Sequence, residues 1–102
     1  MSRFSQHYYK TKFIEKYKLG REDSRYADTI IRYLHREKRY MGHDVDRRAL
    51  RKELENHVRM VWDIGPIGWA FFFRWFVIPI INNAIEFWLG VQTNAPASNK
   101  TD

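Results

Sequence analysis

Apolar and polar residues follow a helical period through the first part of the chain. Aromatic residues recur at every fourth position from Tyr9 to Tyr17, which places them on one face of a helix. Ser5 can cap the start of this helix, and Gly20 suits the left-handed position that ends one. The pattern therefore predicts a first amphipathic helix from about Ser5 to Leu19.

Two further amphipathic helices are predicted before the chain changes character. Each has an acidic or hydroxyl residue in place to cap its first turn, and apolar residues at helical spacing behind that cap. The sequence Ile64-Gly65-Pro66 then breaks the pattern. The expected bounds are Asp23 or Ser24 to about Tyr40 for the second helix, and, with Asp44 as its cap, Val45 to about Trp62 for the third.

A long apolar segment follows the break. Pro66 is tolerated as the first residue of a helix, and Gly90 predicts a stop after Leu89. Residues 67–91 would form roughly 37 Å of helix, which is enough to cross a bilayer. Tryptophans stand near both ends of the segment, as interfacial anchors do. We predict a transmembrane helix here.

Polar residues interrupt this segment. Each ionised group near the centre of a bilayer costs about 2.5–3.5 kcal/mol, so insertion of the helix alone is close to balance. Asn82, Asn83 and Glu86 share one helix face, whereas Arg74 lies near the first interface. We interpret the polar face as a contact with a larger membrane protein, in which ionised Glu86 needs a cation or several hydrogen-bond donors from its partner. The alternative is that the membrane ends near Ile81 rather than near Trp88.

The predicted fold class is all-α, with three amphipathic helices, one transmembrane helix and an extended polar tail. The expected regions are a basic amphipathic part over residues 1–63, the span over residues 64–91 and a polar tail over residues 92–102. The tail has no apolar periodicity and should be disordered when it is alone.

Charge is distributed unevenly along the chain. Residues 1–63 hold 16 Lys and Arg against 10 Asp and Glu, so they carry all of the net charge of +6. The positive-inside rule places this side in the cytoplasm, the matrix or the stroma. The first fourteen residues lack acids and carry Arg3, Lys10 and Lys12, a composition like that of a mitochondrial presequence.

The sequence offers no catalytic group. There is no cysteine, and none of the four histidines pairs with another at helical spacing, so we expect neither an enzyme nor a metal or cofactor site. The basic and aromatic run from His35 to Tyr40 is typical of a solvated helix end, and we do not expect nucleic acid as a partner. The candidate lipid or interface residues are Arg59, Trp62, Trp69, Arg74, Asn82, Asn83 and Glu86, the first four for an anionic lipid such as cardiolipin.

Three features together resemble the supernumerary single-pass subunits of mitochondrial oxidative-phosphorylation complexes. They are the basic arm Arg3–Lys18, the basic helix Arg47–Arg59 and the aromatic span Trp69–Trp88. The resemblance is one of layout. It implies a non-catalytic accessory subunit that stabilises or helps assemble an electron-transport or ATP synthase complex. It also implies a place in the mitochondrial inner membrane with the N-terminus in the matrix, and other subunits and membrane lipids as partners.

Two other classes of protein remain open at this point. The chain could be an independent small membrane regulator or assembly factor. It could also be a soluble helical module that binds nucleic acid or protein, with residues 64–91 as its buried core helix. Extraction from membranes separates the soluble class from the other two, and co-purification with a large complex separates the accessory subunit from the independent protein.

Overall fold

The computed structural model describes residues 5–37 and 46–101, with side chains described as far as Val91. The described residues are almost entirely helical and contain no strand. Three separate helices precede a long fourth helix in which three pieces follow one another without a break. The separate helices are α1 (Gln6–Tyr17), α2 (Arg21–Glu37) and α3 (Arg47–Val61), and the pieces are α4 (Pro66–Gly68), the π-helical turn η1 (Trp69–Phe73) and α5 (Arg74–Thr101). The all-α prediction is confirmed.

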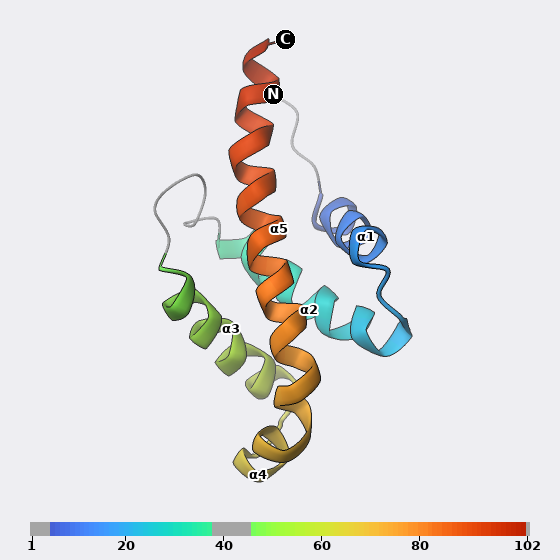
Figure 1. Cartoon of the computed structure of the whole chain (residues 1–102), viewed down its shortest axis with the longest axis vertical. Helices are drawn as coiled ribbons and strands as arrows, with labels where there is room; N and C mark the ends of the chain where they lie inside the picture. The colour runs from blue at the N-terminus through green and yellow to red at the C-terminus, as the bar shows by residue number, and fades with distance from the viewer. Residues whose placement is uncertain (1–4, 38–45, 102) are drawn as a thin grey trace.

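The long helix forms the axis of the molecule. Figure 1 shows α5 running along the longest dimension, with α1 and α3 on opposite sides of it and α2 crossing behind. Helix α2 packs against α1, α3 and α5, and α3 also packs against α5. The three shorter helices therefore surround part of the long one.

One hydrophobic core joins all of the helices. Apolar residues on α5 recur at helical spacing from Val77 to Trp88, and this stripe faces the other helices. The ring of Tyr9 lies 5.1 Å from that of Trp88, and the ring of Phe13 lies 5.3 Å from that of Phe87. The largest fully buried side chains are Trp88, Phe13, Ile30, Ile31, Leu34, Leu50, Leu54, Ile81, Val58 and Val77.

Helix α1 starts as the sequence predicts and ends differently. The Ser5 hydroxyl accepts a hydrogen bond from the backbone N–H of Tyr8, which confirms the cap. Lys18, not Gly20, takes the left-handed conformation, and the N–H of Leu19 bonds back to the carbonyl of Ile14. This pairing is a Schellman motif, in which the apolar residue after the left-handed position packs on the helix. Leu19 supplies that contact, so the prediction that Gly20 takes the left-handed position is wrong.

The starts of α2 and α3 also differ from the predicted ones. Helix α2 begins at Arg21, because the carbonyl of Gly20 accepts the first helical bond from Ser24. Asp46 caps α3 and accepts from the N–H groups of Arg48 and Ala49, so Asp44 is not its cap. The predicted end of the second helix near Tyr40, and the predicted start of the third at Val45, lie outside the described residues.

The fourth helix begins at Pro66 as predicted but runs past its expected stop. Its backbone stays helical through Thr101, so the extended tail that we predicted after Val91 is wrong. Gly90 lies within the helix, where a glycine costs only about 1 kcal/mol relative to alanine. Residues Pro66–Val91 are long and apolar enough to cross a membrane by length and composition.

Candidate functional site

Exposed apolar side chains gather at one end of the molecule. This end comprises the last turn of α3, α4, η1 and the start of α5, and lies at the bottom of Figure 1. The exposed fraction is 74% at Ile67, 72% at Trp75 and 70% at Phe71. We call this surface the aromatic pole, and its residues are Met60, Val61, Ile67, Phe71, Phe72, Trp75 and Phe76.

The buried ring of Tyr26 on α2 contacts rings at the base of the aromatic pole. The ring of Tyr26 lies 4.7 Å from that of Trp62 and 5.7 Å from that of Phe76. Burial raises the pKa of Tyr26, with a further increase from Glu22. The indole N–H of Trp62 donates to the hydroxyl of Thr29, 3.2 Å away. These contacts fix the start of the long helix against α2.

Arginines surround the base of the aromatic pole. The guanidinium of Arg25 lies 5.5 Å from the ring of Trp62, and that of Arg59 lies 6.0 Å from the ring of Trp69. Both distances are within the range of a cation–π interaction. The Nε atom of Arg59 is buried and has no hydrogen-bond partner among the described residues. Arg74 is exposed beside Trp75.

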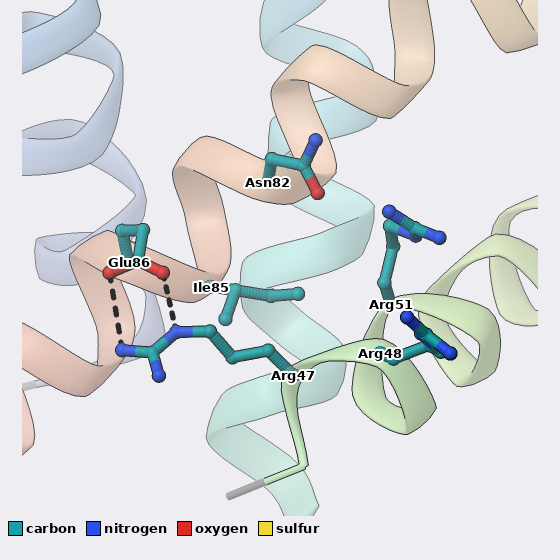
Figure 2. A pocket seen from close by; sticks show the side chains of 6 residues that line it. All are labelled: Arg47, Arg48, Arg51, Asn82, Ile85 and Glu86. Carbon is teal, nitrogen blue, oxygen red and sulfur yellow. Dashed lines mark hydrogen bonds and ion pairs between the residues drawn. The ribbon is translucent and has the colours of Figure 1, made fainter.

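A pocket with mostly polar side chains around it lies where α3 meets α5. Figure 2 shows six side chains around this pocket, with Arg47 reaching across to Glu86. The Nε atom of Arg47 lies 2.6 Å from one oxygen of Glu86, and its second donor lies 3.3 Å from the other. Both side chains are more than half exposed, so the pair contributes at most about 1 kcal/mol. The lining residues are Arg47, Arg48, Arg51, Asn82, Ile85 and Glu86.

The structure divides the lipid or interface residues that the sequence predicted. It brings Arg59 to Trp69, and it places Asn82 and Glu86 at the same pocket. Trp62 and Trp69 are turned toward the protein, since Trp62 is half-buried and Trp69 is buried. Arg74 and Asn83 make no hydrogen bond or ion pair with another described residue. Glu86 finds its cation in Arg47 of its own chain, so it does not need one from a partner.

Two features of this arrangement were not predicted from the sequence. The first is Arg47 as the partner of Glu86, because nothing in the sequence links residues 39 positions apart. The second is the division of the apolar segment into an exposed pole and a buried stripe. A signal for the stripe existed, since Val77, Ile81, Ala84 and Trp88 fall at intervals of three and four residues.

The described part of the chain holds no group of acidic or histidine side chains that could bind a metal ion. His57 is half-buried, and its ring lies 4.4 Å from that of Tyr33. Burial lowers the pKa of His57, and the charge of Arg36 lowers it further. Its place against α2 gives this histidine a packing role.

No protein-family model, curated protein sequence or solved structure matches the chain. The geometry of the aromatic pole and of the surrounding arginines is therefore the basis on which a function can be argued.

Proposed function

We propose that this chain is a non-catalytic accessory subunit that stabilises or helps assemble a multi-subunit complex of the mitochondrial inner membrane. An electron-transport complex or the ATP synthase is the class of complex that its layout resembles. The observation that carries the proposal is the aromatic pole, because small soluble proteins rarely leave so many large apolar side chains exposed together. Such a surface requires a membrane or a partner to cover it.

The basic body of the molecule, which is formed by α1, α2 and α3, supports the same proposal. Nearly all of the Lys and Arg residues precede the long helix, so the body suits the matrix side of the inner membrane. Membrane attachment would then occur through the long helix, whose first turns carry most of the aromatic pole. Membrane lipids, with cardiolipin among them, and neighbouring subunits are the proposed partners.

Co-migration with a large complex tests this function. Inner membranes that express a tagged chain would be solubilised in mild detergent and separated on a native gel. We expect the chain to migrate with one respiratory or ATP synthase complex, and its deletion to lower the amount of that assembled complex. Migration only as a free chain, with normal levels of every complex, would contradict the proposal.

Protease protection tests the orientation. A protease added from the intermembrane-space side should leave α1, α2 and α3 intact, because these helices would lie in the matrix. Loss of these helices under the same treatment would reverse the proposed orientation.

A soluble binding module is the second candidate function. The observation that favours it is the buried stripe on α5, where Val77, Ile81 and Ala84 have no exposed surface. This is how the core helix of a soluble bundle is packed. Recovery of the chain in the membrane-free fraction of lysed mitochondria would support this candidate against the accessory subunit.

A further inference from the structure

The large exposed apolar side chains of the described residues are almost confined to the aromatic pole. Tyr8 is the one such residue elsewhere, and it is only 37% exposed. The indole N–H of Trp75 is the one nitrogen or oxygen group on the seven side chains of the pole, and the exposed charged residues between them in the chain are Asp63 and Arg74. A lipid surface accepts this composition, whereas protein interfaces mix apolar contacts with about one hydrogen bond per 100–200 Å².

The charges beside the pole match an anionic lipid surface. The guanidinium of Arg59 lies 6.0 Å from the ring of Trp69, and the guanidinium of Arg74 belongs to an exposed residue directly before Trp75 in the chain. Phosphate groups of lipids are acceptors for such donors. Each basic residue near an anionic membrane strengthens binding by about fivefold.

The rest of the long helix is not available to lipid in this fold. Trp88 is 1% exposed and lies against Tyr9, while Glu86 is paired with Arg47 on α3. Moving this half of the helix into hydrocarbon would either strip away α1, α2 and α3 or carry their charged outer faces into the membrane. Asp28 on α2, for example, has Lys10 and Arg32 as ion-pair partners at the surface of the bundle.

We propose that the aromatic pole enters one leaflet of a bilayer that carries anionic lipids, and that the helix does not cross the membrane in this fold. The apolar side chains would lie about 5–10 Å deep, at the boundary between headgroups and acyl chains. The helical body stays in the water and headgroup layers. This mode of attachment rests on the proposed membrane function and specifies the lipid surface that the chain binds.

Tryptophan quenching by brominated lipids separates entry of the pole from a full crossing. Wild type, Trp75→Phe and Trp88→Phe would be bound to vesicles of brominated phosphatidylcholine with phosphatidylglycerol. Entry of the pole predicts that the quenched emission is largely lost in Trp75→Phe and kept in Trp88→Phe. A crossing helix would place both tryptophans in lipid, so equal losses in the two variants would overturn the proposal.

Binding of the full chain to the same vesicles tests the pole directly. Phe71 and Phe72 are about two-thirds exposed, so changing both to serine removes apolar surface without disturbing the core. Because burial of one phenylalanine is worth about tenfold or more in affinity, the double variant should bind at least tenfold more weakly. Tyr8→Ser is the matched control and should change binding less than twofold. Equal binding by the double variant and wild type would overturn the proposal.

The proposed function and this mode of attachment can fail separately. A wild-type chain that migrates with a complex but binds no vesicle keeps the function and overturns entry of the pole into lipid. A chain that binds vesicles through the pole but joins no complex keeps the attachment and contradicts the accessory subunit.

Discussion

Lys18 and Asp63 occupy the same place in two helix-ending turns. Both have positive φ angles, of 53° and 55°, and each is followed by an apolar residue that packs on the core. A left-handed conformation costs most non-glycine residues about 1–2 kcal/mol, whereas Asp tolerates it better than Lys does. The strain should therefore be greater at Lys18.

We predict that Lys18→Gly raises the free energy of unfolding by about 0.5–1 kcal/mol, and that Asp63→Gly gains less. The gain is the left-handed strain minus the larger entropy that glycine loses on folding. Urea denaturation measures both changes. Lys16→Gly, inside the last turn of α1, is the control and should lose about 1 kcal/mol. A loss of stability in Lys18→Gly would contradict the helix-ending geometry.

His57 should make stability depend on pH. Burial first, and Arg36 second, lower its pKa below the ordinary 6.5. The unfolded chain therefore binds the proton more readily than the folded chain does. The contribution of His57 is complete above pH 6.5 and is lost as pH falls from 6.5 through the lowered pKa.

Urea unfolding of wild type and His57→Gln, from above pH 6.5 down to about pH 5, measures this contribution. The difference in unfolding free energy should shift against the wild type as the solution is acidified. A difference that stays constant with pH would show that His57 protonates equally in both states.

At the scale of single helices, the sequence predicted that each helix exists better than it predicted the residues at which each helix begins and ends. Helical periodicity and Pro66 located four helices, because apolar spacing and a fixed proline φ act locally. The end of α1 at Lys18 and the start of α2 at Arg21 depend instead on which backbone carbonyl accepts which N–H group. Gly20 was therefore predicted as the left-handed residue, although Lys18 is the residue in that conformation.

The long helix shows why the sequence could not predict which of its apolar residues are exposed in the aromatic pole and which are buried in the stripe. Hydropathy alone cannot distinguish an apolar residue that meets lipid from one that meets another helix of the chain. Ile67 and Ile81 contribute equally to such a profile, yet Ile67 is 74% exposed and Ile81 is fully buried. Only the placement of α1, α2 and α3 separates these two positions.

This pair of isoleucines gives a matched prediction for the helix. Ile81→Ala should lower the free energy of unfolding by about 2–5 kcal/mol, because it opens a cavity in the core. Ile67→Ala should change it by no more than about 0.5 kcal/mol, because its side chain is already in solvent. Thermal or urea unfolding of the two variants checks both values. Similar losses would mean that the stripe and the pole are not distinct in solution.

The whole molecule combines an apolar end with a basic body, and membrane binding should show both. Raising the ionic strength from 0.1 M to 1 M shortens the Debye length from about 10 Å to about 3 Å. Binding to anionic vesicles should therefore weaken with salt but persist, because salt does not screen the burial of the apolar side chains of the aromatic pole. Vesicle co-sedimentation across this range measures it. Complete release by salt would assign the binding to charge alone.

The buried stripe on α5, which completes the core, follows the aromatic pole in the chain, and this order has a consequence for synthesis. The ribosome releases α1, α2 and α3 first, then the aromatic pole, and only afterwards the residues from Val77 to Trp88. At about 5–20 residues per second, synthesis of Phe76, the last residue of the pole, precedes that of Trp88 by about 0.6–2.4 seconds. During that interval a nascent chain offers its most membrane-seeking segment while its own helices still lack the surface that would hold them together. Targeting factors and chaperones therefore meet this chain before its fold can compete with them.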